Sequence, residues 1–225
     1  MLIDFKNVQI QRGSRIVLAA VNVSLGEQRI GIIGLNGSGK SSLIRLINGL
    51  LLPAHGQVTV DGLDTRQNSG EIRQHVGFVF QNPDNQIVFP VVHEDIAFGL
   101  KHRVSDPALK AQKVVKSLEY LGISHLHDRF IQELSGGEKQ LVALAAVMAT
   151  DPSLLIFDEP TTQLDMRARN HFVRVLAELP QQAIVVSHDL ELIRTMQRVL
   201  VLHEERLAYD GMAQEAIDWF REHCA

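Results

Sequence analysis

The sequence reads Gly34-Leu35-Asn36-Gly37-Ser38-Gly39-Lys40-Ser41-Ser42 directly after an apolar run at residues 30–33. Its three glycines let successive backbone N–H groups turn inward around an anion, and a helix that follows would point its positive N-terminus at the same place. Lys40 supplies a charge for the outer phosphates of a nucleoside triphosphate, and the Ser41 hydroxyl can ligate the accompanying Mg²⁺. A chance glycine-rich turn is the alternative. The context favours a strand, a phosphate-binding loop and a helix whose apolar side carries Leu43, Leu46, Ile47 and Leu50.

The composition is ordinary for a soluble globular domain, because 45% of the 225 residues are hydrophobic and 21% are charged. A net charge of −4 disfavours nonspecific binding to nucleic acid, since neutralising phosphates takes clustered Lys and Arg. The longest apolar stretch, residues 141–149, falls short of the ~20 residues that cross a bilayer. Because the first residues lack a basic region followed by an apolar core, we expect no secretory signal, and the lone Cys224 excludes an intrachain disulfide. We expect one large cytoplasmic domain that can carry an inserted lobe.

The first part of the chain is predicted to form strands. Apolar and polar residues alternate at residues 2–10 and 17–25, and a further short strand is expected at residues 57–60. Antiparallel pairing of these strands would give a sheet that flanks the phosphate-binding loop. A compact apolar run at residues 76–80 predicts another strand, which ends in a polar turn.

The middle of the chain is predicted to be a helical insertion, at residues 91–122. Asp106 is a candidate N-cap with Pro107 at the first helical position, and one face carries Val114, Leu118 and Leu121. A second long helix follows Leu134-Ser-Gly-Gly-Glu138. Its buried side is expected to carry Leu141, Leu144, Ala145 and Met148.

The last part alternates strands and helices. Residues 154–157, 183–186 and 199–202 are short and apolar, as expected of strands buried on both faces. Helical segments at residues 166–179 and 190–197 lie between them. This order predicts βαβ crossovers and a parallel sheet.

Residues 154–160 read Leu-Leu-Ile-Phe-Asp-Glu-Pro, so a buried strand ends in the carboxylates of Asp158 and Glu159. Open α/β sheets present their ligands at this end of the strands. Asp158 would hold Mg²⁺ directly or through water. Glu159 would act as general base or orienter for an attacking water, a role typically worth about 10² to 10⁴ in rate. An acidic pair that caps the next helix is the alternative.

The chain resembles the ATP-binding-cassette (ABC) ATPases over nearly its whole length. The resemblance rests on an ordered series of motifs: residues 34–42, Gln81, Leu134-Ser-Gly-Gly-Glu138, Asp158-Glu159, Leu164-Asp165 and His188. It implies an α/β P-loop NTPase fold, with residues 1–225 as one ABC nucleotide-binding domain. Residues 1–82 and 150–225 would form a RecA-like core with an antiparallel β subdomain, and residues 83–149 a helical subdomain. ATP and Mg²⁺ are the implied cofactors, and ATP hydrolysis is the implied reaction.

The signature Leu134 to Glu138 places Ser135, Gly136 and Gly137 before a helix, where they form a second anion-binding helix terminus. The resemblance implies that this terminus acts on a second copy of the chain. Two subunits would stack head to tail, and Ser135 and Gly137 would close on the γ-phosphate held by Lys40 of the other copy. A simple helix cap is the alternative.

Three further residues take roles from the resemblance. Gln81 would reach the Mg²⁺ or the attacking water, beside the metal ligands Ser41 and Asp158. His188 would donate a hydrogen bond to the γ-phosphate, and Asp165 would shape the dimer interface. A solvated Gln, a structural His and a helix N-cap are the respective alternatives.

The family usually places an aromatic residue shortly after the first strand, where it stacks on adenine. This chain has Gln-Arg-Gly-Ser at residues 11–14 instead. The guanidinium plane of Arg12 is a candidate replacement, because Arg stacks on π-faces. We therefore expect weak base selectivity.

Two minor features lie outside these motifs. His125, His127 and Asp128 offer metal-ligand groups, but their alternate spacing in a polar loop without Cys favours a solvated turn. Trp219 and Phe220 are expected to pack the last helix against the rest of the chain.

Residues 78–88 resemble the corresponding segment of energy-coupling-factor ATPases, which drive the uptake of vitamins and transition metals. This segment would form a cleft together with the acidic residues Glu94 and Asp95 and three apolar residues. The cleft would receive a basic coupling helix of a transmembrane scaffold protein. The apolar residues are Ile87, Val88 and Phe89. An ordinary surface loop is the alternative. Residues 138–146 and 160–165 look most like the ATPase subunit of biotin transporters.

We therefore predict the ATP-hydrolysing motor of a vitamin importer, with biotin as the expected vitamin. It would be a homodimer bound peripherally to the cytoplasmic face of the membrane, with a transmembrane scaffold and a membrane-embedded substrate-binding protein. An ATPase of a cobalt, nickel or other ABC importer is the nearest alternative. A soluble ABC ATPase that acts on nucleic acid would need basic patches or a coiled-coil insertion. A small-molecule phosphotransferase would bind phosphate through the same loop but does not require the signature Leu134 to Glu138.

Overall fold

The computed structural model describes residues 1–224. These residues form two compact units. The first unit comprises residues 1–76, residues 153–159 and the chain from Gln181 onward, and the second comprises residues 77–152 and 160–180. The helical subdomain predicted at residues 83–149 falls within the second unit, and its assignment as a subdomain stays a prediction.

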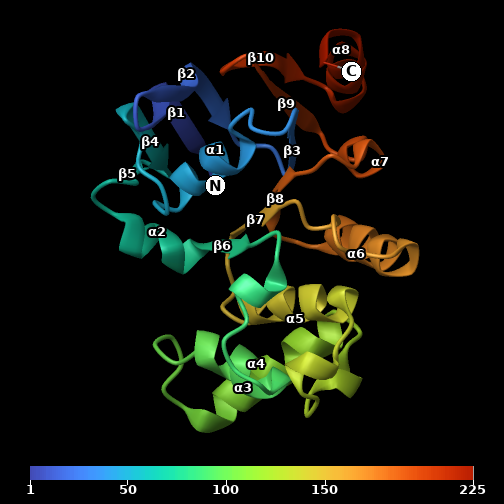
Figure 1. Ribbon diagram of the computed structural model, residues 1–225. Helices are drawn as coiled ribbons and strands as arrows, with labels where there is room; N and C mark the ends of the chain where they lie inside the picture. Colours follow the sequence, from blue (N-terminus) through green and yellow to red (C-terminus); the bar gives the residue numbers. More distant parts are fainter. Residues whose placement is uncertain (225) are drawn as a thin grey trace. The chain divides into compact units, whose positions relative to one another are not determined.

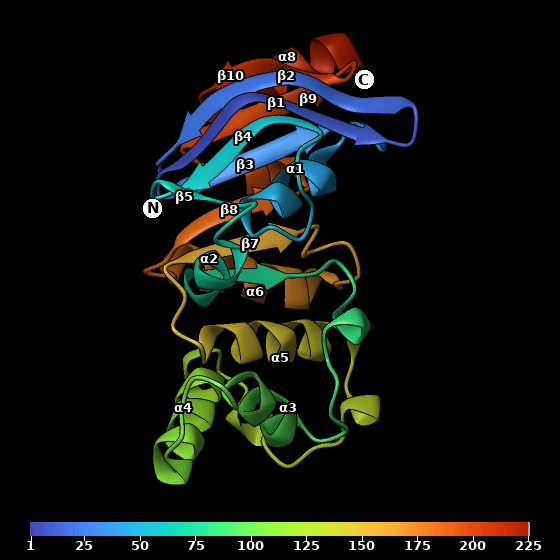
Figure 2. The same ribbon diagram turned by 90° about the vertical axis from the view of Figure 1, so that its left-hand side faces the viewer.

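An antiparallel sheet in the first unit confirms the predicted early strands. It contains β1 (Ile3–Arg12), β2 (Arg15–Leu25), β4 (His55–Val60) and β5 (Leu63–Asp64), in the order β2-β1-β4-β5 (Figure 2). The alternation of side chains across the pleat explains why the sequence alternates: the apolar residues of β1 are buried and the polar ones are half-buried or exposed.

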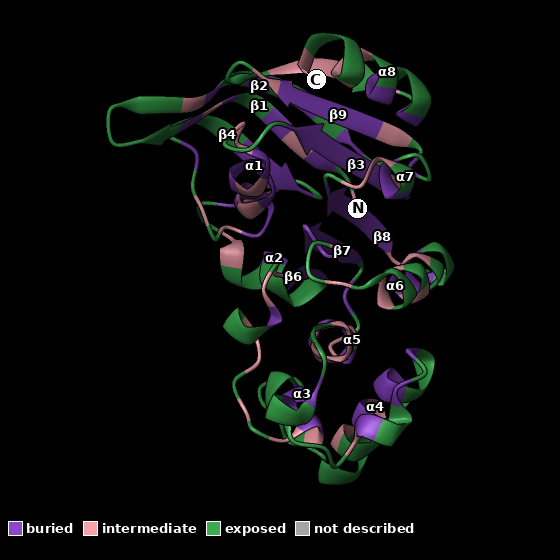
Figure 3. Ribbon diagram, turned by 45° about the vertical axis from the view of Figure 1, so that its right-hand side comes forward, coloured by how far each residue is buried: buried purple, intermediate pink, exposed green. Residues whose placement is uncertain are grey.

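The second sheet of this unit is mainly parallel. Its strands β3 (Arg29–Gly34), β7 (Leu154–Asp158), β8 (Gln182–Val186) and β9 (Arg198–His203) run in the order β9-β3-β8-β7. Every residue of β7 and β8 is buried, as the apolar sequences predict (Figure 3). β10 (Arg206–Gly211), which the sequence analysis did not predict, pairs antiparallel with β9.

The helices of the first unit are α1 (Lys40–Ile47), α2 (Ser69–His75), α7 (Leu190–Ile193) and α8 (Ala213–Cys224) (Figure 1). Two predictions for them are wrong. Leu50 is half exposed and lies beyond the end of α1, and the helix predicted at residues 190–197 ends at Ile193. At the C-terminus, Trp219 stacks on Tyr209 with ring centroids 6.1 Å apart, so it does hold the last helix on β10.

The second unit is mainly helical. It contains α3 (Val92–Gly99), α4 (Pro107–Tyr120), α5 (Gly136–Met148), α6 (Met166–Glu178) and most of strand β6 (Val76–Val79), with short 3₁₀ turns between them. The predicted cap of α4 is confirmed, because the Asp106 carboxylate accepts a hydrogen bond from the N–H of Ala108. On α5, Leu141, Leu144 and Ala145 are buried as predicted, and Met148 is half-buried. No helix of residues 1–224 has both the length and the apolar character that a bilayer crossing requires.

Candidate active site

The phosphate-binding loop joins β3 to α1, as predicted. Gly39 precedes α1 with φ of +98°, and a Cβ atom there would lie 2.8 Å from the Cγ of Leu18. Glycine is therefore required by both the backbone angle and the packing. Among the described residues, no side chain caps the N-terminus of α1. Its first N–H groups are thus positioned to bind an anion.

Lys40 lies across this loop with only 7% of its surface exposed. Its Nζ donates hydrogen bonds to the carbonyl oxygens of Gly34 and Leu35, at 2.8 and 3.1 Å, and lies 3.3 Å from Nε2 of His188. Burial lowers the pKa of Lys40, while the nearby carboxylates of Glu159 and Asp158 act in the opposite direction. The ammonium group is therefore an incompletely solvated cation that donates to neutral carbonyl oxygens, and phosphate oxygens would be stronger acceptors.

The two proposed magnesium ligands of the first unit are in direct contact. The Ser41 hydroxyl donates to Oδ1 of Asp158 at 2.7 Å, although the two residues are 117 positions apart. Arg45 donates to the other carboxylate oxygen at 3.3 Å. A hydroxyl and a buried carboxylate are oxygen donors of the kind that Mg²⁺ prefers, so the residues present fit that ion. The sequence analysis missed Arg45, although it follows Ser41 by four positions on the same face of α1.

Glu159 is held in a strained conformation at the end of β7. Its φ of +52° lies in the left-handed region, and only 7% of the surface of Glu159 is exposed. Oε2 accepts a hydrogen bond from the N–H of His188 at 3.1 Å, and Oε1 lies 3.1 Å from Nε2 of the same residue. Burial raises the pKa of Glu159, with His188 and Lys40 opposing that effect. A buried carboxylate with a raised pKa has the character of a general base.

His188 contacts both Lys40 and Glu159. Its Nε2 lies 3.3 Å from Nζ of Lys40 and 3.1 Å from Oε1 of Glu159. It follows the buried strand β8, and the next residue, Asp189, caps α7 through the N–H of Leu192. The fold therefore brings three of the predicted site residues together from three separate segments of the chain. We call this group, with Ser41 and Asp158, the catalytic half-site.

The signature residues lie in the second unit, at the N-terminus of α5. Ser135 is the N-cap, and its N–H and hydroxyl both donate to Oε2 of Glu138, at 2.8 and 2.7 Å. The N–H of Glu138 donates back to the Ser135 hydroxyl at 3.3 Å, which completes a capping box. These hydrogen bonds lower the pKa of Glu138. Ser135 and Gly136 are exposed, so this terminus is open to a partner.

Gly137 is required by packing between α5 and α6. A Cβ atom on Gly137 would lie only 2.6 Å from the Cβ of Ala168. Asp165 is the N-cap of α6, because its Oδ1 accepts from the N–H of Ala168 at 2.8 Å. The alternative of a helix cap is therefore confirmed for both Ser135 and Asp165. Neither cap excludes a role at an interface, since both side chains stay exposed. We call the group of Ser135, Gly136, Gly137 and Glu138 the signature half-site.

Two more of the predicted residues have simple surroundings. Arg12 is exposed at the end of β1, and its Nη2 donates to the Ser42 hydroxyl at 3.3 Å, so it lies beside the phosphate-binding loop. Gln81 is exposed in the second unit, shortly after β6. Its approach to the metal stays a prediction.

A cavity of about 280 Å³ in the second unit lies at the segment predicted to receive a coupling helix. Phe78, Val88, Phe98 and Ala146 contribute apolar walls, and Val88 is 69% exposed. The predicted role of Asp95 is wrong. It is buried, and its Oδ1 accepts the N–H groups of Val88 and Phe89, at 2.7 and 3.0 Å, so it orders the segment and does not offer a free charge. Glu94 alone remains exposed.

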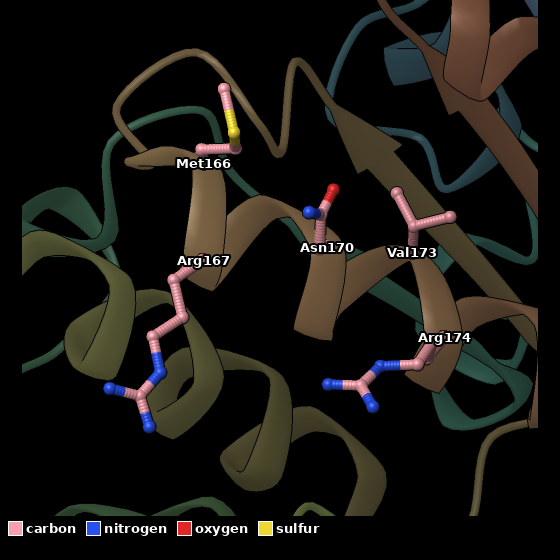
Figure 4. A pocket seen from close by; sticks show the side chains of 5 residues that line it. All are labelled: Met166, Arg167, Asn170, Val173 and Arg174. Carbon is pink, nitrogen blue, oxygen red and sulfur yellow. The ribbon is translucent and has the colours of Figure 1, made fainter.

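A second hollow lies on the surface of α6. Figure 4 shows the side chains that line it, which project from successive turns of this helix: Met166, Arg167, Asn170, Val173 and Arg174. None belongs to the phosphate-binding loop, so the hollow is not the nucleotide site. Met166, which lines it and follows Asp165 in the sequence, is 79% exposed.

Comparison with known proteins gives a consistent result. The family model described as "ABC transporter" matches residues 18–162. The chain is 49% identical to the biotin transport ATP-binding protein BioM of Rhizobium etli, over 99% of both chains. It is 39% identical to the cobalt import ATP-binding protein CbiO of Syntrophus aciditrophicus, over 94% of this chain and 79% of that one.

The fold also matches a solved ATP-binding cassette, MJ0796, whose structure is a dimer in a post-hydrolysis state with bound ADP and Pi. The TM-score is 0.83 at 26% identity, and the match covers 94% of this chain and 98% of the other. The phosphate-binding loop, with the buried Lys40 and Glu159 and the exposed His188, therefore lies in a fold that this chain shares with a solved ATP-binding cassette. The chain belongs to the ABC transporter family and is one of its ATP-hydrolysing cassettes.

Proposed function

We propose that this ATPase drives an energy-coupling-factor importer and that the imported compound is biotin. The proposal that this site hydrolyses ATP rests on one observation: His188 contacts both Lys40 and Glu159 beside the phosphate-binding loop. The biotin assignment is supported by the 49% identity to a BioM protein over 99% of both chains. Cobalt is the second candidate, because a CbiO protein is 39% identical.

The chain's own groups account for triphosphate binding. The loop N–H groups and the N-terminus of α1 would bind the phosphates, and Lys40 would exchange the carbonyl oxygens of Gly34 and Leu35 for phosphate oxygens. Ser41 and Asp158 would hold Mg²⁺. That ion, when bound, neutralises charge on the phosphates. Arg12 would stack on the base beside Ser42.

Hydrolysis would use the charges already assembled. Glu159 accepts a proton from the attacking water, the water oxygen bonds to the γ-phosphorus, and the bond to the bridging oxygen of ADP breaks. His188 holds the Glu159 carboxylate in place and would donate to a γ-phosphate oxygen. A base of raised pKa suits this step, because it binds the transferred proton more firmly than an exposed carboxylate does.

Two copies are needed in this proposal. Ser135 and Gly136 of the signature half-site are exposed, and this half-site carries no catalytic carboxylate, whereas the catalytic half-site lacks the signature donors. Ser135, Gly136 and Gly137 of one copy would therefore close over the phosphates bound at Lys40 of the other. The dimeric state of the solved cassette and the exposure of Asp165 and Met166 support this arrangement.

Coupling to a membrane partner would occur at the apolar cavity of the second unit. Val88 and Phe98 are exposed there, and a helix with apolar residues from a transmembrane scaffold protein would bury them. The chain would thus be a peripheral protein at the cytoplasmic face of the membrane. It would work with that scaffold and with a membrane-embedded substrate-binding protein.

Transport assays in the source cells test this proposal. We expect a chromosomal Glu159→Gln variant to abolish ATP-driven uptake of labelled biotin and to leave Co²⁺ uptake unchanged. Glu119→Gln is the matched control, because Glu119 is exposed on α4. Loss of Co²⁺ uptake with normal biotin uptake would favour the second candidate. Normal uptake of both compounds would contradict an importer role for this site.

A further inference from the structure

Two segments of the second unit that are distant in sequence lie side by side at its surface. The N–H of Val92 donates to the carbonyl of Arg129 at 3.2 Å, and the N–H of His93 donates to the carbonyl of His127 at 3.1 Å. Val91 and Phe130 form an antiparallel bridge at the end of this ladder. The backbone therefore fixes the start of α3 against the loop that follows residues 124–126.

This pairing brings together three side chains that carry metal-ligand atoms. The imidazole rings of His93 and His127 are stacked with centroids 4.7 Å apart and planes 8° apart. Oδ1 of Asp128 lies 2.7 Å from Nδ1 of His127 and 3.5 Å from Nδ1 of His93. All three residues offer one ligand atom within 4.8 Å of the other two. The two rings are less than 40% exposed, and the Asp128 carboxylate is open to solvent.

We propose that His93, His127 and Asp128 form a binding site for a divalent transition-metal ion of the Zn²⁺ type. Two imidazoles and one carboxylate are a ligand set that suits Zn²⁺ and its neighbours Co²⁺ and Ni²⁺. Around Zn²⁺, ligand atoms about 2.0 Å from the ion stand about 3.3 Å apart. The two distances to Oδ1 lie on either side of that value. Because a metal ion lies in the plane of each imidazole that binds it, the two rings would turn out of their parallel stack, and Nδ1 of His93 would leave the carbonyl oxygen of His127, which lies 3.1 Å from it.

The site differs in kind from the magnesium position of the catalytic half-site. Ser41 and Asp158 provide only oxygen donors, which suit Mg²⁺, whereas imidazole nitrogen favours the transition metals. The sequence by itself favours a solvated turn over a metal site at His125, His127 and Asp128, and His125 is exposed. The histidine that the fold places beside His127 and Asp128 is His93, 34 positions before His127.

A bound ion would link the start of α3 to the loop at residues 127–130. Asp95 and Phe98 of the same helix line the apolar cavity, so the ion would stabilise one wall of it. Because an ion that binds only the folded chain adds stability by mass action, the melting temperature would rise with its concentration.

Titration calorimetry of the full-length chain with ZnCl₂ tests the proposal. The protein is first stripped with a chelator and then held in excess Mg²⁺, which keeps the catalytic half-site occupied. We expect one Zn²⁺ per chain to bind the wild type, and its affinity to fall by more than about tenfold in His93→Gln, His127→Asn and Asp128→Asn, since even outer-sphere changes weaken metal sites by that factor.

Two variants serve as controls. His125→Asn makes the same chemical change on a neighbouring exposed histidine. Cys224→Ser removes a thiol that lies 3.3 Å from Nδ1 of His203, because Cys224 and His203 together are another pair of groups that could bind Zn²⁺. Both should bind Zn²⁺ like the wild type. Unchanged melting temperatures without Zn²⁺ show that the three site variants remain folded. The proposal would be overturned if the wild type bound no Zn²⁺. It would also be overturned if Cys224→Ser lost Zn²⁺ binding while His127→Asn retained it.

Discussion

The catalytic and signature half-sites both lie at a helix N-terminus, yet their charged groups are in opposite conditions. Glu159 is buried among groups from other segments, and burial raises its pKa. Glu138 is partly exposed and accepts two hydrogen bonds from Ser135, three residues earlier, which lower its pKa. In the catalytic half-site, burial disfavours the charged form of Glu159, which suits a group that accepts a proton during the reaction. In the signature half-site, hydrogen bonds from a neighbouring residue stabilise the charge of Glu138, and the helix terminus stays open to a partner.

This comparison predicts that catalysis depends most on Glu159. Glu159→Gln keeps the shape of the side chain and removes its basicity, so we expect ATP hydrolysis to fall by about 10²- to 10⁴-fold while ATP binding persists. Steady-state hydrolysis and equilibrium ATP binding measure the two effects. Glu119→Gln on α4 should hydrolyse ATP like the wild type. Full activity of Glu159→Gln would show that another group acts as the base.

The signature half-site should depend on packing as well as on its donors. In Gly137→Ala the new methyl group would overlap Ala168, so we expect the free energy of unfolding to fall by about 1–3 kcal/mol. Gly136→Ala is the matched control, because its Cβ would lie 3.4 Å from the Gln163 carbonyl oxygen, a close contact that a small shift relieves. Urea unfolding of both variants measures the difference. Equal stability of the two would refute close packing at Gly137.

The capping box predicts a smaller effect that depends on pH. Glu138→Ala should destabilise the chain by about 1 kcal/mol at neutral pH, because the Ser135 N–H loses its acceptor. Since the folded-state pKa of Glu138 is lowered, its contribution is present above the unfolded pKa of about 4.3 and disappears as the pH falls through the folded value. The stability difference should therefore shrink in acid.

Glu138→Gln separates the hydrogen bond from the charge. It can still accept from Ser135, so most of the stability should remain while the pH dependence of this position is lost. Urea unfolding between pH 3 and 7 follows both variants. A difference between Glu138→Ala and the wild type that stays constant over this range would contradict the cause assigned to the lowered pKa.

The smallest predicted effect concerns the contact between Arg12 and the adenine base of ATP. Arg12→Ala should weaken ATP binding by about two- to fivefold, the range expected of one exposed cation–π contact. Arg15→Ala, across the β1–β2 turn, removes the same charge from an exposed position and serves as the control. Fluorescent nucleotide titration measures both. If the two variants bind ATP equally, Arg12 does not stack on adenine.

Local features of this molecule could be predicted from the sequence because neighbouring residues determine them. The glycines of the phosphate-binding loop, the cap at Asp106 and the helix cap at Ser135, which the sequence offered as an alternative, are defined by residues within a few positions of one another. The apolar runs that form β7 and β8 likewise predict their burial. Their order along the chain was enough to predict the family.

The tertiary structure decided what depends on residues that are distant in sequence. It placed Ser41 on Asp158 across 117 positions, turned Asp95 inward onto the backbone of Val88, and stacked His93 on His127. It also ended α7 at Ile193, where helical spacing continued. Burial and charge at a site come from all the segments that pack around it. Periodicity and spacing describe one segment at a time, so they could not show which side chains would meet.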